Sequence, residues 1–446
     1  MPLNRLADNE GLPASVLSGP TVSAADGRIR LVHITTVPES LNFLAGQVGY
    51  MTARGLSVTA VSSPGSELGA FGAREAVPTY AVAMARRITP LRDLISIWQI
   101  YRVLRRIRPH IVHAQTPKGG LLGTIAAWLA GVRVRVYHIR GLPFMTATGA
   151  RRRLLWTTER IACGLSHAVL CVSHSVRDVA IAERLCAPGK ITVLLGGSGN
   201  GVDAEGRFDP RHEPDRRDRT RERLGIPPNA DVIGYVGRIV RDKGVVELVR
   251  AWSELRDAYP NARLLIVGAF EPQDPIPRDV EGILRGDPRV HLTGQVHETA
   301  PLYAAMDLVV LPTYREGFPN VPLEAASMGL PVVATRVPGC TDAVEDGVTG
   351  TLVAPRDSGA LADAVGAYLR DSDRRSAHGS AGRRRVLLEF RRELIWDALY
   401  DHYITLLKRH GRTGPRMPRV PVGEVPPGLG NRAATPEETP EDATYR

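Results

Sequence analysis

The chain has 446 residues, of which 43% are hydrophobic and 23% charged, and 57 basic against 47 acidic residues give a net charge of +10. This composition excludes a fibrous or wholly disordered chain, and the length exceeds what one core usually holds, so we expect two domains. The four cysteines lack disulfide or metal-ligand spacing, and no apolar segment fits a signal peptide or a membrane span, which favours a cytoplasmic protein with reduced thiols.

The first half alternates predicted strands and helices. Residues 1–27 are polar, and we expect them to be disordered. An apolar strand follows at 28–34, and a helix is predicted over about 40–54. Further strands are predicted at 56–61, 111–115, 132–138, 167–172 and 191–195. This alternation predicts a Rossmann-like domain over residues 28–205.

The second half restarts the pattern after a charged stretch at 209–223 that has no apolar period, so we interpret residues 206–228 as a linker. A helix is predicted at 245–258. Strands are predicted at 232–236, 262–267, 289–293, 307–311 and 332–335. We therefore predict an α/β protein with two doubly wound, Rossmann-like domains facing across a cleft, the second over residues 229–388. A helix over 389–410 is expected to cross back to the first domain, and a disordered tail over 411–446 ends the chain.

A basic segment lies in the first half. Between Arg86 and Arg108 seven arginines stand against one acid, Asp93, and they are interleaved with aliphatic residues and Trp98. This spacing predicts an amphipathic helix whose basic face is either solvated or rests on anionic lipid. A second stretch, 144–156, repeats the composition and favours an anionic membrane surface as partner. No nucleic-acid-binding motif is present, so we expect no nucleic acid partner.

Two turns that follow predicted strands combine glycine with cations. Gly237-Arg238-Ile-Val-Arg-Asp-Lys243-Gly244 follows the strand at 232–236 and offers an Arg fork and a Lys point charge, which suits an anion cradle. Thr116-Pro-Lys118-Gly119-Gly120 follows the strand at 111–115 and leads into an apolar helix. Both turns predict sites for anions such as phosphate.

A pair of glutamates flanks a third predicted strand-to-helix turn, Glu316-Gly-Phe-Pro-Asn-Val-Pro-Leu-Glu324, with a short helix expected from Glu324. Gly317 lets the backbone approach a ligand closely, and amides at a helix start can donate to its oxygens. Glutamates alone are mostly surface residues. Carboxylates for hydroxyls beside a cradle for phosphates, however, predict a sugar-nucleotide site at the carboxyl edge of the sheet.

Four short motifs together point to a known family: Gly237-Arg238 with Lys243-Gly244, the Glu316–Glu324 pair, Gly329-x-Pro331-Val332 and Asp346-Gly347-x-x-Gly350. With them, residues 28–405 resemble a glycosyltransferase of family 4, which has the GT-B architecture of two Rossmann-like domains. Four stretches of the first half narrow the resemblance to bacterial polysaccharide-synthesis enzymes that glycosylate acceptors on undecaprenyl diphosphate. They are His113–Lys118, Arg140–Pro143, Cys171–Ser175 and Gly197–Asp203.

The resemblance implies a retaining, metal-independent transfer of a hexose or N-acetylhexosamine, without a cofactor. The donor would be a nucleotide-diphosphate sugar, expected to be UDP-linked, and the acceptor a polyprenyl-diphosphate-linked sugar at the inner face of the plasma membrane. Arg238 and Lys243 would neutralise the donor diphosphate, Glu316 would bind the sugar hydroxyls and Glu324 the ribose.

The implied residues form three sets. The donor-binding set is Arg238, Lys243, Gly294, Glu316, Gly317, Phe318, Pro319, Asn320, Val321 and Glu324. The catalytic set is Glu316, Arg238, Lys243, His138 and Arg140. The acceptor-binding set is Lys118, Gly119, Arg140 and Asn200.

One position departs from the family pattern. Many relatives carry a His immediately before the Gly that follows the 132–138 strand, whereas this chain has Arg140-Gly141. His138 lies on the same face two residues earlier, so either side chain can contact the donor, or His138 can be a hydrogen-bonded core residue. Three alternatives remain open: a family 4 transferase with a soluble or other lipid acceptor, a sugar-nucleotide epimerase and a catalytically silent binding subunit.

Overall fold

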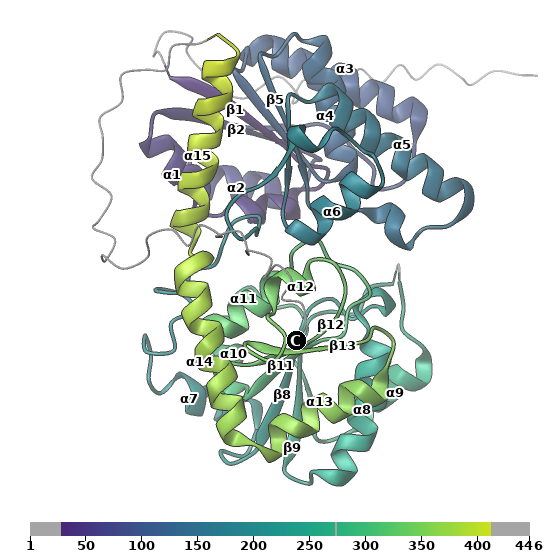
Figure 1. The fold of residues 1–446 in the computed structure, drawn as a ribbon, viewed down its shortest axis with the longest axis vertical. Helices are drawn as coiled ribbons and strands as arrows, with labels where there is room; N and C mark the ends of the chain where they lie inside the picture. Colours follow the sequence, from purple (N-terminus) through teal and green to yellow (C-terminus); the bar gives the residue numbers. More distant parts are fainter. Residues whose placement is uncertain (1–27, 273, 412–446) are drawn as a thin grey trace, which may run out of the picture. The chain divides into compact units, whose positions relative to one another are not determined.

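The computed structural model describes residues 28–272 and 274–411, and two parallel β-sheets organise them (Figure 1). The predicted disordered segment 1–27 lies outside the described residues, as does the predicted tail except Gly411.

Seven parallel strands form the first sheet, in the order β3-β2-β1-β4-β5-β6-β7. Apart from β3, each strand overlaps a predicted one. The bounds are β1 Ile29–Ile34, β2 Leu56–Ser62, β3 Thr79–Ala81, β4 Ile111–Gln115, β5 Val134–Ile139, β6 Ala168–Cys171 and β7 Ile191–Val193. Alternate residues of β1 join different apolar clusters, Leu31 on one face and Val32 on the other, because helices cover both faces of a parallel sheet.

Helices of the first domain connect these strands. Their bounds are α1 Gln47–Ala53, α2 Ser66–Glu75, α3 Pro90–Ile107, α4 Pro117–Leu129, α5 Gly149–Leu165 and α6 His174–Ala182. The single helix predicted over 40–54 is wrong, because a 3₁₀ helix, Pro38–Leu44, and α1 share that stretch. They are separated at Gly46, whose φ of 77° favours glycine and whose Cβ would stand 2.8 Å from the ring of Trp396.

Six parallel strands form the second sheet, in the order β10-β9-β8-β11-β12-β13. The bounds are β8 Asp231–Val236, β9 Ala262–Val267, β10 Val290–Leu292, β11 Leu308–Leu311, β12 Val332–Thr335 and β13 Gly350–Val353. Its helices are α8 Val245–Ala258, α9 Arg278–Gly286, α10 Ala300–Ala305, α11 Asn320–Ser327, α12 Cys340–Ala343, α13 Ser358–Arg370 and α14 Ser372–Glu389. The predicted helix 245–258 is confirmed, whereas β13 was not predicted.

The segment predicted as an irregular linker contains a helix, α7, Arg216–Leu224. It lacks an apolar period because arginines dock it. Arg221 is almost fully buried, and its guanidinium donates to Asp307 Oδ2 at 2.8 Å and to the carbonyl of Ala305 at 3.0 Å. A buried, hydrogen-bonded ion pair therefore attaches α7 to the domain, where other helices use apolar contacts.

The helix predicted over 389–410 corresponds to α15, Arg392–Arg409, and it follows α14, which ends at Glu389 and was not predicted. Side chains of α15, among them Leu399 and Tyr403, join the apolar cluster that contains Leu31 of β1. Among the described helices none is both long enough and apolar enough to span a membrane.

The order of strands places loops with charged residues together. Each sheet reverses its strand order at one point, between β1 and β4 in the first and between β8 and β11 in the second. Open α/β sheets bind ligands outside the carboxyl ends of strands at such a point. In the second sheet, β8 leads into Gly237–Lys243 and β11 leads into the loop that holds Glu316.

Candidate active site

The loop between β11 and α11 carries Glu316. The helix α11 begins at Asn320, so the prediction of a helix start at Glu324 is wrong and that glutamate lies in the second turn. Pro319 occupies the N-cap position, with extended backbone. A proline just before the helix sets where it begins and leaves residues 316–318 as loop.

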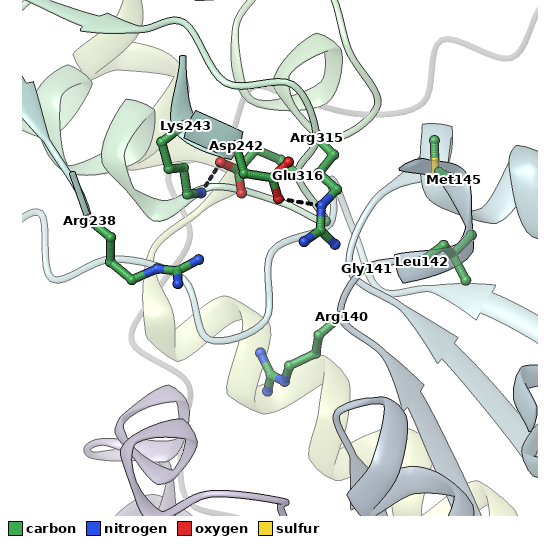
Figure 2. Close-up of a pocket in the computed structure, with 10 residues that line it drawn as sticks. Arg140, Gly141, Leu142, Met145, Arg238, Asp242, Lys243, Arg315 and Glu316 are labelled. Carbon is green, nitrogen blue, oxygen red and sulfur yellow. Dashed lines mark hydrogen bonds and ion pairs between the residues drawn. The ribbon is translucent and has the colours of Figure 1, made fainter. Parts of the chain in front are cut away.

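Glu316 forms an ion pair with Lys243, whose Nζ donates to Oε1 of the carboxylate (Figure 2). Lys243 ends a short 3₁₀ turn after β8, and Gly244 follows it with a φ of 70°. A Cβ at Gly244 would stand 1.9 Å from the carbonyl oxygen of Pro312, so only glycine brings this turn onto the β11 loop. A second ion pair across the same two loops joins Arg315 Nε to Asp242 Oδ2 at 2.7 Å.

Three guanidinium groups, those of Arg140, Arg238 and Arg315, point into the space beside these ion pairs (Figure 2). Arg238 contacts Glu271 Oε2 at 2.8 Å, yet half of its side chain stays exposed. We call the cavity here the polar pocket. It holds about 190 Å³ and is lined by Arg140, Gly141, Leu142, Met145, Arg238, Asp242, Lys243, Arg315, Glu316 and Gly317.

A second cavity of about 320 Å³, which we call the loop pocket, shares several of these residues. Its lining is Phe43, Arg140, Val172, Gly199, Asn200, Val236, Gly237, Arg238, Lys243, Leu311, Glu316, Gly317, Phe318, Pro319, Asn320 and Val321. All the predicted donor-binding residues except Gly294 and Glu324 therefore line one cavity. Residues of both domains contribute to its walls.

The charge of the polar pocket is positive, because four cationic side chains face two carboxylates there. The carboxylates each hold one cation, Glu316 holding Lys243 and Asp242 holding Arg315. Arg140 forms no ion pair with any described carboxylate, so its charge is available to a bound anion. Such a surplus of positive charge suits a diphosphate.

Gln115 holds Arg140 in place. The Arg140 Nε donates to Gln115 Oε1 at 2.7 Å, and the guanidinium lies over the ring of Phe43 at 4.7 Å from its centroid. Burial lowers the pKa of Arg140 to about 10, which leaves the group charged at neutral pH. A Cβ at Gly199 would stand 2.0 Å from Nη1, so glycine there makes room for the guanidinium.

His138 does not face either cavity and is a buried core residue. Its Nδ1 lies 3.1 Å from Nε2 of His113, and the other ring nitrogen of His113 bonds to the hydroxyl of Tyr403 on α15. Burial, and next the charge of Arg140, hold the pKa of His138 well below its usual range. Of the two residues expected near the donor sugar, the structure places only Arg140 at the cavity wall.

Two predicted donor residues lie outside both cavities. Glu324 Oε2 accepts a hydrogen bond of 2.8 Å from the hydroxyl of Tyr303, and burial raises the pKa of this carboxyl. Gly294 follows β10, and its carbonyl accepts from the amide of Gly268 at 2.9 Å. Both still lie toward the carboxyl edge of the second sheet, so their nucleoside contacts remain predictions.

The predicted acceptor residues have internal partners. Lys118 Nζ contacts Asp93 Oδ1 at 2.7 Å and the carbonyl of Ala85 at 2.7 Å. The Gly119 amide donates to Thr36 Oγ1 at 2.8 Å, and a Cβ at Gly120 would strike the ring of Tyr137, so these glycines serve close packing of α4 and not a free anion cradle. Asn200 Oδ1 accepts from Gln47 Nε2 and Trp396 Nε1. Asn200 lines the loop pocket, but its amide group already has partners.

Loops of the two sheets touch at Gly317. Its carbonyl accepts a hydrogen bond of 2.8 Å from Ser173 Oγ, which also caps the start of α6. Nearby, Asp342 Oδ1 accepts from the amide of His174 at 2.8 Å, and Ser175 Oγ accepts from the amide of Gly339 at 2.7 Å. Ser173 and Ser175 thus explain why the 171–175 stretch carries small hydroxyl residues.

Sequence reasoning missed several residues of the site. Asp242 precedes Lys243 and Arg315 precedes Glu316 in the chain. A charged residue next to a predicted site residue was therefore a signal by which both could have been predicted. Gln115 could have been noticed as a polar residue at the end of an apolar strand. Phe43 and Met145 carried no such signal, and short 3₁₀ helices bring them to the cavities.

Comparisons with known proteins agree with this geometry. Residues 230–371 match the family model described as glycosyl transferases group 1, and residues 42–197 match the one described as glycosyl transferase 4-like domain. The chain is 33% identical over 379 residues to the capsular polysaccharide biosynthesis glycosyltransferase CapM of Staphylococcus aureus, which covers 85% of this chain and 98% of CapM. It is 28% identical over 292 residues to the Escherichia coli UDP-Gal:alpha-D-GlcNAc-diphosphoundecaprenol alpha-1,3-galactosyltransferase, covering 65% of this chain and 73% of that protein.

Solved structures share the fold. Anabaena HepE in complex with UDP and glucose superposes with a TM-score of 0.71 at 20% identity, covering 85% of this chain and 100% of HepE. WaaG, a glycosyltransferase involved in lipopolysaccharide biosynthesis, gives a TM-score of 0.63 at 17% identity, covering 84% of this chain and 99% of WaaG. The predicted GT-B fold with two parallel-sheet α/β domains is confirmed.

Proposed function

The chain belongs to the group 1, family 4 glycosyltransferases, and from this premise we propose that it transfers a hexose or N-acetylhexosamine from a UDP-sugar to a polyprenyl-diphosphate-linked sugar in surface polysaccharide synthesis. One observation carries the proposal. The Lys243–Glu316 ion pair, Arg238 and Arg140 line one cavity to which both domains contribute.

The charges of the polar pocket support a nucleotide-diphosphate donor. Transfer breaks the bond between the anomeric carbon and the diphosphate, which leaves with the bonding electron pair as a nucleoside diphosphate. Arg238, Lys243 and Arg140 are placed to stabilise that developing charge, since each is a cationic side chain that lines the pocket. In this proposal these side chains suffice without a metal ion.

The nucleoside is proposed to be uridine on the strength of two relatives. HepE was solved with UDP and glucose, and the Escherichia coli relative is described as acting on UDP-Gal. In this chain, Glu316 would bind sugar hydroxyls with the carboxylate oxygen that Lys243 leaves free, while the loop 316–321 would line the sugar and phosphates.

The acceptor sugar would supply a hydroxyl that forms the new bond to the anomeric carbon. Its proton passes to an oxygen of the departing diphosphate, and attack on the face the diphosphate leaves retains the anomeric configuration. We propose that the cleft closes while the old bond breaks and the new bond forms. Closure would exclude water and so limit hydrolysis of the donor.

Peripheral membrane attachment at the inner face of the plasma membrane completes the proposal. Leu91 and Leu94 on α3 are 80% and 63% exposed, and Ile95 and Trp98 of the same helix are also exposed. Arginines surround them, Arg102 stacking on the ring of Trp98 at 4.8 Å. An exposed apolar stripe among arginines suits an anionic lipid surface.

A thermal-shift screen against UDP, GDP, ADP and their hexose conjugates tests the donor. A ligand at 100 times its Kd stabilises the folded state by about 2.7 kcal/mol, so UDP and one UDP-sugar should raise the melting temperature. Arg238→Ala should abolish the shift, whereas Arg278→Ala, an exposed arginine on α9 outside both cavities, should keep it. A response to GDP or ADP alone would contradict a UDP-linked donor but keep the proposed site. No response to any nucleotide would contradict the proposal that the protein is a glycosyltransferase.

The same protein then distinguishes transfer from its alternatives. Incubation of the UDP-sugar with lipid-linked sugars in vesicles should release UDP only when the acceptor is present. An altered UDP-sugar formed without acceptor would indicate an epimerase instead, and transfer that is equally fast to soluble sugars would contradict the lipid-linked acceptor.

A further inference from the structure

A third cavity lies within the first domain, between the amino ends of α3, α4 and α5. It holds about 360 Å³, and we call it the helix pocket. Its lining is Thr36, Val37, Ser40, Arg86, Arg87, Ile88, Asp93, Thr116, Pro117, Lys118, Leu121, Pro143, Arg151, Leu154, Leu155 and Thr158. The three helices lie side by side in Figure 1, α4 contacting both α3 and α5.

The helix pocket adjoins the site of transfer. Pro143 lines it, while the preceding residue, Leu142, and Met145 line the polar pocket. Residues 143–146 form a 3₁₀ helix, so one turn of backbone separates the two cavities. A molecule held in the helix pocket can therefore present a sugar to the polar pocket.

Three arginines at the helix pocket carry charge that no strong ion pair with a described residue neutralises. Arg87 and Arg151 form no ion pair with any other described residue, and Arg86 has only a 3.8 Å contact with Glu39 between two largely exposed side chains. Exposed pairs of this kind contribute little. Lys118 differs, since Asp93 neutralises it. The net charge at the pocket is thus positive and unsatisfied.

Apolar side chains form another part of the lining and continue onto the surface. Leu121, Leu154 and Leu155 form the wall, and Ile88 at the mouth is 56% exposed. Leu91 lies at the start of α3, shortly after Ile88 in the chain, and is the most exposed residue of the stripe described above. Apolar surface therefore runs from the inside of the pocket to the face assigned to the membrane.

Cations beside an apolar channel fit an amphiphile that has an anionic head and a hydrocarbon chain. We propose that the helix pocket binds the diphosphate and the first isoprenoid units of a polyprenyl diphosphate, with Arg86, Arg87 and Arg151 at the diphosphate and Leu154 and Leu155 along the chain. This inference rests on the proposed function, because it locates the lipid end of the acceptor. The remaining isoprenoid chain would leave the pocket past Ile88 into the bilayer.

Farnesyl diphosphate is a suitable probe because it carries the same head and the first isoprenoid units. Its binding to the full chain is measured by calorimetry with UDP saturating, so that the donor site cannot take the diphosphate. Farnesol and inorganic pyrophosphate should each bind at least about tenfold more weakly than farnesyl diphosphate, because each lacks one half of the interaction.

Variants with matched controls test the residues. Arg87→Ala and Arg151→Ala should each weaken farnesyl diphosphate binding about tenfold, whereas Arg92→Ala and Arg153→Ala, exposed arginines of α3 and α5 that do not line the pocket, should not. Leu154→Asn should weaken farnesyl diphosphate but leave pyrophosphate unchanged. Leu154 and these arginines are exposed, so the melting temperature should stay the same and confirm the fold.

Three outcomes would overturn the inference. Pyrophosphate binding as tightly as farnesyl diphosphate would make the site a simple anion site. Equal losses in the Arg92 and Arg153 controls would reduce it to surface charge. Normal UDP binding with no farnesyl diphosphate binding would refute this inference alone, whereas failure of UDP to bind would refute the proposed function independently.

Discussion

The Nε atom of Arg140 donates a hydrogen bond of 2.7 Å to Oε1 of Gln115, and this is the bond that holds a guanidinium at the wall of both cleft cavities. Gln115 is itself fixed by His33, whose Nδ1 lies 3.0 Å from Gln115 Nε2. Strands β1, β4 and β5 thus position a cation that none of the described carboxylates pairs with.

Replacing Gln115 should uncouple Arg140 from this support. Gln115→Leu is expected to lower turnover about tenfold and the free energy of unfolding by about 1–3 kcal/mol, because a buried partner of Arg140 and His33 is lost. Steady-state kinetics and urea unfolding measure both. His33→Leu is the comparison, since it should cost similar stability but removes only the support behind Gln115, so turnover should fall less than in Gln115→Leu. Equal turnover in both variants would contradict a positioning role for Gln115.

The Lys243–Glu316 pair should matter for catalysis more than for stability. Both side chains are partly exposed, and such pairs stabilise a fold weakly. Glu316→Gln keeps the shape of the side chain but removes the charge, and we expect kcat/KM to fall about 10²–10³-fold with an unchanged melting temperature. Asp346→Asn breaks a pair with Arg336 that faces solvent and should leave activity intact. A normal kcat/KM in Glu316→Gln would remove this residue from the site.

Gly317 should tolerate no side chain. A Cβ there would stand 1.9 Å from the carbonyl oxygen of Arg140, closer than any real contact, so Gly317→Ala must displace the β11 loop from the first domain. Activity should fall at least about tenfold. Gly282→Ala on α9 is the matched control, because its Cβ meets nothing within 4 Å, and it should raise stability by about 0.5–1 kcal/mol. Full activity in Gly317→Ala would show that this close contact is dispensable.

Acidification should destabilise the folded protein through its buried histidines. Burial lowers the pKa of His33 to about 3 and holds those of His113 and His138 well below 6.5. The unfolded chain therefore binds more protons than the folded one, so stability present above pH 6.5 is lost as the pH falls. Each histidine adds a slope of up to about 1.4 kcal/mol per pH unit between pH 6.5 and 5.

Urea unfolding at several pH values measures this slope. His33→Asn should reduce this slope by up to the contribution of one histidine. A slope that is identical in wild type and His33→Asn would show that His33 titrates normally in the folded state.

Attachment to lipid should depend on the exposed apolar residues of α3. Leu91→Asn with Leu94→Asn should reduce co-sedimentation with vesicles that contain anionic lipid, and stability should be unchanged because both residues are exposed. Leu388→Asn, at a residue of α14 that is also exposed, serves as the control. Binding that persists in the α3 variant would place the membrane contact elsewhere.

Local patterns in the sequence were sufficient for most strands and for the residues at the centre of the candidate site. The strands before Gly237 and before Glu316 were predicted from short apolar runs, and their positions in parallel sheets follow from βα alternation. Arg238, Lys243 and Glu316 could be predicted because each lies within a few residues of a strand end. The family model matches and the fold neighbours confirm the predicted family and GT-B fold.

Only the tertiary structure decided which side chains meet. His138 and Arg140 lie on one face of one strand, yet His138 bonds to His113 in the core while Arg140 reaches the cavities. Lys118 looked available to an anion until Asp93 was found beside it. Helix α7 lacked an apolar period because its buried Arg221 pairs with Asp307, 86 residues away. Periodicity records burial along one element, whereas hydrogen-bond and charge partners depend on how distant elements pack, which no local pattern contains.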